Sequence, residues 1–201
     1  MKRPPVWLLV AVTATGSLAL NIFVPSVPGL VTYFATDLAT VQLAISLYLV
    51  GVAGGQLVYG SLSDRFGRRP VLLVGLVVYV FGGLACALAP AIEVLVAGRV
   101  LQALGACAGF VIGRAMVRDV YGRERAASAL GYLTAAVSVV PAVAPAIGGT
   151  LEVWFGWRAS FVLVVIVGVA VLMIAHAKAH ETHFERQPEG WGDLLRSYVR
   201  L

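Results

Sequence analysis

Six long apolar stretches, separated by short polar segments, constrain this chain more than any other feature of its sequence. They cover residues 6–27, 41–60, 71–89, 94–117, 126–150 and 160–176. Each is about as long as a helix that crosses the roughly 30 Å hydrocarbon core of a bilayer. None shows the alternation of apolar and polar residues that a membrane-spanning β-strand requires. The sequence therefore predicts an all-α membrane protein with six transmembrane helices.

Composition excludes the other broad classes of chain. The 201 residues are 60% hydrophobic and 12% charged, whereas about a quarter of the residues in a soluble domain are charged. Disorder requires low hydrophobicity and high net charge. The net charge of +5 comes from basic clusters between apolar stretches, which indicates membrane topology and no nucleic-acid partner. Cys86 and Cys107 lie inside apolar stretches, which favours small buried side chains over a disulfide or metal role.

The basic residues also predict the orientation of the chain, because Lys and Arg accumulate on the cytoplasmic side of a membrane. Of the 15 Lys and Arg residues, only Arg99 and Arg158 fall on the other side of a six-span topology. Both termini are then cytoplasmic. A cleaved signal peptide at Ser17–Ala19 is disfavoured, since the first apolar stretch continues past it to Val27.

The last residues change character. Residues 1–176 are expected to form the transmembrane bundle and residues 177–201 a cytoplasmic tail. Within that tail the apolar residues recur at the spacing of one helix face, which predicts an amphipathic helix on the inner membrane surface. They are Trp191, Leu194, Leu195, Tyr198 and Val199.

The segment between the second and third stretches is the most specific motif in the chain. It reads G-S-L-S-D-R-F-G-R-R over residues 60–69. A general basic loop explains the arginines but not the glycines and the aspartate at this spacing. The segment resembles the G-x-x-x-D-R-x-G-R-R signature of the major facilitator superfamily at every position. The matching residues are Gly60, Asp64, Arg65, Gly67, Arg68 and Arg69.

Further matches are similar to the Bcr/CflA-type drug:proton antiporters of that superfamily. They are Q-L-V-Y-G at residues 56–60, R-V-L-Q-A-L-G at 99–105, R-D at 118–119 and P-A-V-A-P-A-I-G-G at 141–149. The resemblance implies the amino-terminal half of a twelve-helix transporter in a bacterial inner membrane, with the tail beginning the linker between halves. It implies export of small amphipathic compounds driven by a proton gradient, with no enzyme activity and no cofactor. The implied partners are the lipid bilayer, a small-molecule substrate, and a missing carboxy-terminal half or a second copy.

A repeat supports this fold independently of the resemblance. Gly60-Ser61-Leu62, Phe66-Gly67 and Arg69 recur 89 residues later as Gly149-Thr150-Leu151, Phe155-Gly156 and Arg158. One copy follows the second stretch and the other follows the fifth, on opposite sides of the membrane. This placement is what a three-plus-three inverted repeat requires.

The resemblance also implies roles for polar residues within the stretches. Arg99 lies about 7.5 Å from the start of its apolar stretch at residue 94, at 1.5 Å per residue. The residues alone therefore leave open whether its side chain snorkels to the membrane surface or faces an internal cavity. The resemblance favours a cavity role in proton coupling, with Gln102 one turn away. Asn21 stands where the resembled antiporters have an aspartate, and an amide cannot titrate. A hydrogen bond between Asn21 and Arg99 is expected from their similar depth.

Two further groups of residues have implied roles. Asp119 is expected to pair with Arg68 in an inner gate that includes Asp64. Pro141 and Pro145 are expected to kink the fifth helix, and with Gly148 and Gly149 they resemble the antiporter signature of the family, which implies a conformational role in exchange. His176, His180 and His183 share a helix face, but without acid or cysteine ligands at comparable spacing no metal site is expected.

Two other functions remain open from the residues. The alternatives to a drug exporter are a facilitator or permease for a polar metabolite, and a truncated fragment that is inactive in transport. The absence of carboxylates from the apolar stretches favours an apolar substrate only mildly.

Overall fold

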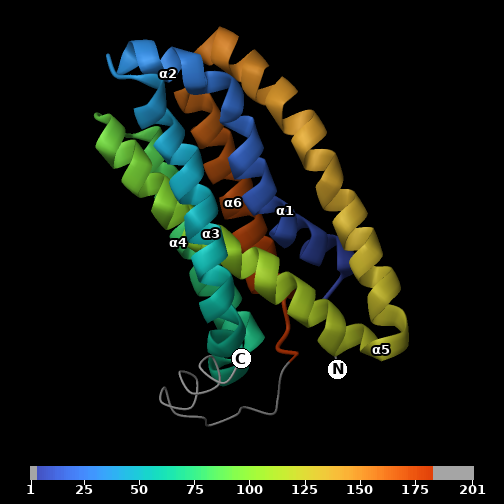
Figure 1. The fold of residues 1–201 in the computed structure, drawn as a ribbon. Coiled ribbons are helices and arrows are strands. Elements are labelled where there is room, and N and C mark those ends of the chain that lie inside the picture. The colour runs from blue at the N-terminus through green and yellow to red at the C-terminus, as the bar shows by residue number, and fades with distance from the viewer. Residues whose placement is uncertain (1–3, 183–201) are drawn as a thin grey trace.

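The chain forms a bundle of long helices, because in lipid a helix is the form in which one segment satisfies all of its own backbone hydrogen bonds. The structure is a computed structural model that describes residues 4–182, apart from the side chains of residues 122–124. The elements in order are α1 (Val6–Ile22), a 3₁₀ turn η1 (Val24–Ser26), α2 (Val27–Tyr33), α3 (Leu38–Phe66), α4 (Arg68–Ala87), α5 (Ile92–Phe155) and α6 (Arg158–Lys178) (Figure 1).

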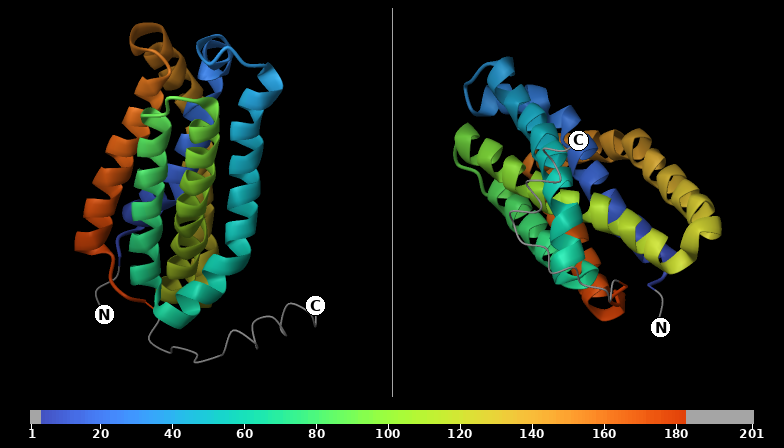
Figure 2. Two further views of the ribbon diagram at one scale, coloured as in Figure 1. Left: turned by 90° about the vertical axis from the view of Figure 1, so that its left-hand side faces the viewer. Right: turned by 60° about the horizontal axis from the view of Figure 1, so that its bottom comes forward.

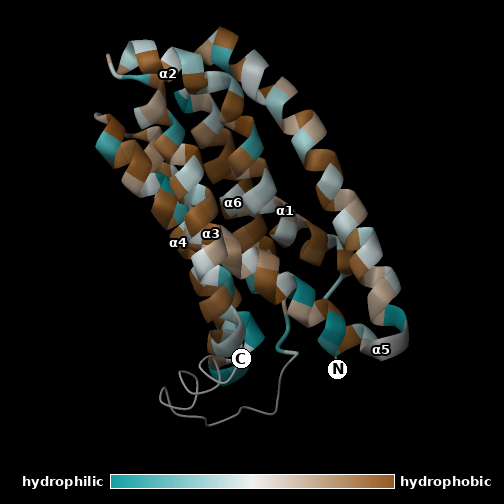
Figure 3. Ribbon diagram, in the orientation of Figure 1, coloured by the Kyte–Doolittle hydropathy of each residue, from teal (hydrophilic) through white to brown (hydrophobic). Residues whose placement is uncertain are grey.

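Six segments of the described chain are long and apolar enough to cross a membrane, which confirms the predicted number of spans. They are Val6–Tyr33, Leu38–Phe66, Arg68–Ala87, Ile92–Tyr121, Arg125–Phe155 and Arg158–Lys178, with mean hydropathies from 1.7 to 2.6. Hydrophobic residues dominate all six, whereas the α3–α4 turn and the reversal of α5 carry hydrophilic residues (Figure 3). The first and last described residues lie at the same end of the bundle as the α3–α4 turn (Figure 2). We call this the arginine-rich end, after Arg65, Arg68 and Arg69.

Two expected boundaries are wrong. The first span does not stop near Val27 but continues to Tyr33, because Pro25 and Pro28 each occupy the first turn of a new short helix, where a proline loses no hydrogen bond. The fourth and fifth spans are not joined by a loop: helical backbone runs through residues 118–125, and α5 reverses direction between its two spans (Figure 1). The last helix, α6, ends at Lys178. The predicted amphipathic helix of the tail lies outside the described residues.

The spans form two matching triplets, which confirms the inverted repeat. The first three are 28, 29 and 20 residues long and the second three are 30, 31 and 21. The second member of each triplet ends at a glycine with positive φ, Gly67 at 96° and Gly156 at 77°, a conformation that favours glycine. In each case the glycine N–H donates to the carbonyl four residues earlier, at 3.0 Å. The two caps lie at opposite ends of the bundle.

The first span of α5 forms the centre of the bundle. It is the most buried of the six, whereas α3 and the second span of α5 are the least buried. A Cβ at Gly105 would overlap the backbone of Tyr79 in α4, and a Cβ at Gly109 would overlap the Val12 carbonyl in α1. The absence of side chains at these two positions therefore sets how closely the helix axes approach.

The α4–α5 crossing yields a stability prediction. Gly105→Ala is expected to lower the free energy of unfolding by about 1–3 kcal/mol, because the new methyl group displaces the α4 backbone. Gly54→Ala is the control, since a Cβ there meets nothing within 4 Å and alanine is the better helix former. Unfolding of the purified variants by dodecyl sulfate, followed by circular dichroism, measures both effects. Equal stability of the two variants would contradict the close approach.

Candidate functional site

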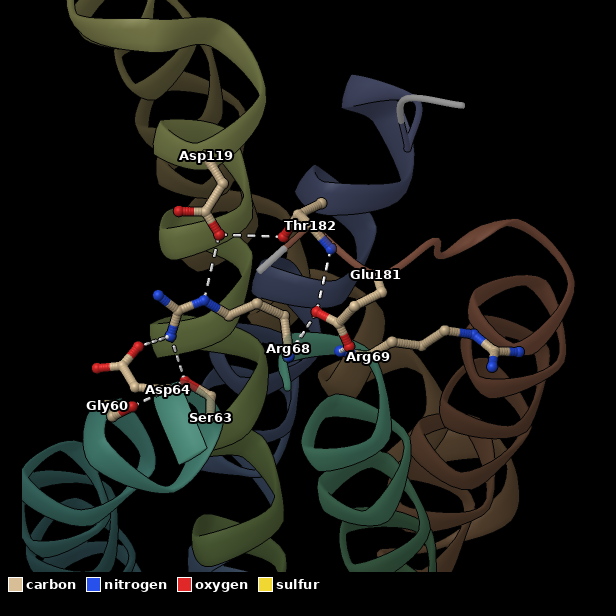
Figure 4. A network of polar contacts seen from close by, with 8 residues as sticks. All are labelled: Gly60, Ser63, Asp64, Arg68, Arg69, Asp119, Glu181 and Thr182. Atoms are coloured by element: carbon tan, nitrogen blue, oxygen red, sulfur yellow. Dashed lines mark hydrogen bonds and ion pairs between the residues drawn. The ribbon is translucent and has the colours of Figure 1, made fainter. Parts of the chain in front are cut away.

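A polar network at the arginine-rich end centres on Arg68, the first residue of α4. The left-handed backbone of Gly67 turns the chain between α3 and α4 and brings Arg68 back over the last turn of α3. Its guanidinium contacts the carboxylate of Asp64 and the hydroxyl of Ser63, and its Nε donates to Oδ2 of Asp119 at 3.2 Å (Figure 4). The Arg68 side chain is only 10% exposed, so these partners replace the water that a buried cation has lost.

The network continues into the residues after α6. The carboxylate of Glu181 accepts the backbone N–H groups of Arg68 at 2.9 Å and Arg69 at 3.2 Å. The Thr182 hydroxyl donates to Oδ2 of Asp119 at 3.0 Å (Figure 4). An acid at a helix N-terminus satisfies free N–H groups and the positive end of the helix dipole. Glu181 therefore caps α4 from a position 113 residues away, and it links α6 to the turn.

Sequence reasoning did not assign Glu181 and Thr182 to this site. A signal for them existed, because α4 begins after a glycine and has no side-chain cap of its own. A helix start without a side-chain cap, next to a basic motif, predicts that an acidic side chain from another segment accepts its free N–H groups. The identity of that acid depends on where α6 ends in space.

The remaining motif residues take separate positions. Arg69 donates to the His176 carbonyl at 3.0 Å, and the Arg65 guanidinium lies 5.4 Å from the centre of the Phe66 ring. Gly60 does not mark a close helix approach, because a Cβ there would meet nothing within 4 Å in the described chain. Its carbonyl accepts the Ser63 hydroxyl at 2.9 Å instead.

A second polar site lies deep in the bundle, where Arg99 is completely buried. Its Nη1 donates to the Ala19 carbonyl of α1 at 3.0 Å and to Oε1 of Gln102 at 2.8 Å. The guanidinium also lies over the Tyr48 ring, 4.2 Å from its centre. Aromatic faces attract such a cation most strongly where water is absent. The snorkelling alternative is therefore wrong.

No carboxylate in the described chain pairs with Arg99. Its Nη2 and the Nε2 of Gln102 are buried without a hydrogen-bond partner among those residues. The guanidinium is held by carbonyls, an amide and aromatic rings, so it is a fixed positive charge in the interior. A charge inside a membrane protein at such a position is a functional-site candidate.

The expected hydrogen bond between Asn21 and Arg99 is wrong. The Asn21 amide donates to the Ser17 carbonyl at 2.7 Å, one turn back along α1. A similar depth in the bundle does not place two side chains on facing surfaces, and Asn21 satisfies its donor locally.

The proline-rich motif of α5 packs against the end of α1. The helix continues through Pro141 and Pro145, and a Cβ at Gly148 would overlap the carbonyl of Ile22. Gly149 lies near Pro25: a Cβ added to Gly149 would lie 3.9 Å from the Cβ of Pro25. The fold thus brings this motif to the end of α1, apart from the Arg68 network.

The comparison with protein families decides the relationship. The model of the major facilitator superfamily matches residues 8–200. The chain belongs to this superfamily. Its fold agrees: a peptide transporter, POT, solved with sulfate, has a TM-score of 0.81 at 16% identity, covering 96% of this chain and 42% of that one. The proton:xylose symporter XylE has a TM-score of 0.73 at 16% identity, and the match covers 86% of this chain and 44% of that one.

Curated members of the superfamily are closer in sequence. A chloramphenicol resistance protein of Pseudomonas aeruginosa is 40% identical over 89% of the chain and 43% of its own length. Multidrug resistance protein D of Escherichia coli is 34% identical over 83% of the chain and 43% of its length. The chain thus spans less than half the length of these relatives. Family and fold are those of multi-pass membrane transporters.

The Arg68 network yields a second stability prediction. Arg68→Lys is expected to cost about 1–3 kcal/mol, because one ammonium group cannot reach Asp64, Ser63 and Asp119 together, and buried acceptors are left without donors. Arg69→Lys is the control, since the one side-chain hydrogen bond shown for Arg69 is exposed, and a change of less than about 0.5 kcal/mol is expected. Thermal unfolding in detergent compares the two. A smaller loss for Arg68→Lys than for Arg69→Lys would contradict the central position of Arg68.

Proposed function

We propose that the chain is the amino-terminal half of an exporter that moves small amphipathic drug-like compounds outward in exchange for protons. The observation that carries the proposal is the 40% identity to a chloramphenicol resistance protein over 89% of this chain. Several relatives named as multidrug resistance proteins match the same region. The transporter lies in a bacterial inner membrane with both termini cytoplasmic, needs no cofactor beyond the proton gradient, and has no enzyme activity.

The two polar sites support a division of roles. The Arg68 network ties α3, α4, α5 and the residues after α6 together at one end, so it suits an inner gate that holds one conformation until its ion pairs separate. The buried Arg99 and Gln102 suit a polar centre whose fixed positive charge acts on a proton moving nearby. Pro141, Pro145, Gly148 and Gly149 would let α5 bend against α1 during the exchange.

The missing half determines the first test. Alternating access needs two bundles that rock about a site between them. Vesicles that hold this chain only as a monomer are therefore expected to show no chloramphenicol efflux. The chain joined to the carboxy-terminal half of the P. aeruginosa relative is expected to export chloramphenicol, and a protonophore is expected to abolish that export.

Two outcomes would contradict these expectations. Export by a demonstrably monomeric chain would overturn the requirement for a second bundle. A joined protein that inserts normally but exports no drug from a panel, and instead equilibrates a sugar or amino acid, would overturn the proposed function in favour of a facilitator.

The amide at position 21 yields a prediction about proton coupling. Asn21 donates to the Ser17 carbonyl, and a carboxyl group can keep this bond only while it holds a proton. Asn21→Asp in the joined protein is therefore expected to strengthen the dependence of export on pH. Asn21→Ala is the control, since it removes the amide without adding a titratable group. Identical pH profiles for native protein and Asn21→Asp, at equal expression, would show that this position does not control coupling.

A further inference from the structure

A cavity of about 230 Å³ lies between α3 and the first span of α5. It is lined by Gln56, Phe110, Val111, Arg114 and Arg118. Three of these five side chains can donate hydrogen bonds, and two carry a permanent positive charge. None of the residues that hold Arg68 or Arg99 takes part in it.

The two arginines point one turn apart along the same face of α5 and are not neutralised. Like charges at this spacing repel each other. Among the side chains of residues 4–121 and 125–182, the structure shows ion pairs for Arg68 but none for Arg114 or Arg118. The adjacent carboxylate, Asp119, is already engaged by Arg68 and Thr182. Among the described side chains, no carboxylate therefore balances the positive charge of the cavity.

The cavity reaches deeper than a surface charge cluster. At 1.5 Å per residue, Arg114 lies about 10 Å and Phe110 about 16 Å from Tyr121, the end of the span. A charge at that depth normally faces a partner or a water-filled space. The Gln56 amide, on the opposite wall in α3, also has no hydrogen bond to another described residue.

The deep end of the cavity is apolar, and its lining residue Phe110 packs against α1. Gly16 of α1 leaves room for the Phe110 ring, because a Cβ there would lie 2.8 Å from ring atom Cζ. An aromatic face and Val111 therefore border the cavity on the inner side, and two guanidinium groups border it towards the arginine-rich end. Guanidinium groups bind planar carboxylates through paired hydrogen bonds.

We propose that this cavity binds a small amphipathic organic anion, with its apolar body against Phe110 and its anionic group on Arg114 and Arg118. The head group of an anionic lipid offers similar chemistry, but it would remain at the level of the membrane surface and leave the Phe110 end empty. The inference rests on the proposed function only in naming the anion as a substrate class: besides neutral compounds such as chloramphenicol, the exporter takes compounds that carry a negative charge.

Binding to the full chain in phosphatidylcholine nanodiscs tests the site. The probes are 2-naphthoate, its neutral amide and 2-naphthylmethylammonium, which share one ring system and differ in charge. Saturable binding of 2-naphthoate is expected, with affinity at least about tenfold higher than for the amide or the ammonium. Equal affinities for the three probes would overturn the proposal.

The variants locate the binding. Arg114→Gln with Arg118→Gln is expected to weaken 2-naphthoate binding about tenfold or more, whereas the same residues changed to Lys retain most of it. Arg125→Gln is the control for the loss of a positive charge from α5, because Arg125 lies outside the cavity lining. Unchanged unfolding temperatures are expected for all three, since neither cavity arginine has an ion pair to lose. Weakening in the Arg125 variant equal to that in the double Gln variant would overturn the site.

Competition with an anionic lipid distinguishes a bound lipid head group from a small anion. Phosphatidylglycerol added to the nanodiscs is expected to leave 2-naphthoate binding unchanged within about twofold. If phosphatidylglycerol abolishes that binding, or copurifies with the native chain but not with the double Gln variant, the cavity holds a lipid head group and the small-anion proposal fails. Failure of the joined protein to export drugs would leave this binding result intact, so the two proposals fail separately.

Discussion

The close contact of helix backbones along the first span of α5 is the constraint on which the rest of the structure depends. Lipid tails are as apolar as leucine, so helices in a membrane gain little by hiding apolar side chains from their solvent and associate mainly through packing. Gly105 and Gly109 bring α4 and α1 against this span without intervening side chains. The polar groups of the interior can reach one another only because these helices are so close.

That packing produces two different environments for arginine. Arg68 lies near the end of the bundle, where Asp64, Asp119 and Glu181 arrive from three directions. An ion-pair network there can separate and re-form as ends of helices move. Arg99 lies deep between helices, where it is held by carbonyls, Gln102 and two aromatic rings. The contacts of Arg99 cannot separate without disturbing the packing of the helices. Its positive charge is therefore a permanent feature of the core.

The inverted repeat explains why the two ends of the bundle are built alike but not equally charged. Gly67 and Gly156 cap their helices in the same way, and the arginine two residues beyond each bonds a carbonyl of a neighbouring segment, His176 for Arg69 and Ala89 for Arg158. The carboxylates are what differ. The Asp64, Asp119 and Glu181 carboxylates gather around the first copy, whereas Arg158 lies against the rings of Tyr33 and Trp157.

The sequence by itself determined the number of spans, the repeat, and the position of the turn glycines, because these follow from local composition and from spacing along one segment. It also identified the pairing of Arg68 with Asp119 through a resemblance, and the structure places the two in contact. Span ends were less predictable, since Pro25 can end one helix or begin another and only packing selects between them. The tertiary structure alone decided that Asn21 bonds Ser17 and not Arg99, that Glu181 caps α4, and that Arg114 and Arg118 share an unneutralised cavity. Such contacts depend on the rotation of each helix about its axis, which is set by the glycine contacts between helices and is not written in any one segment.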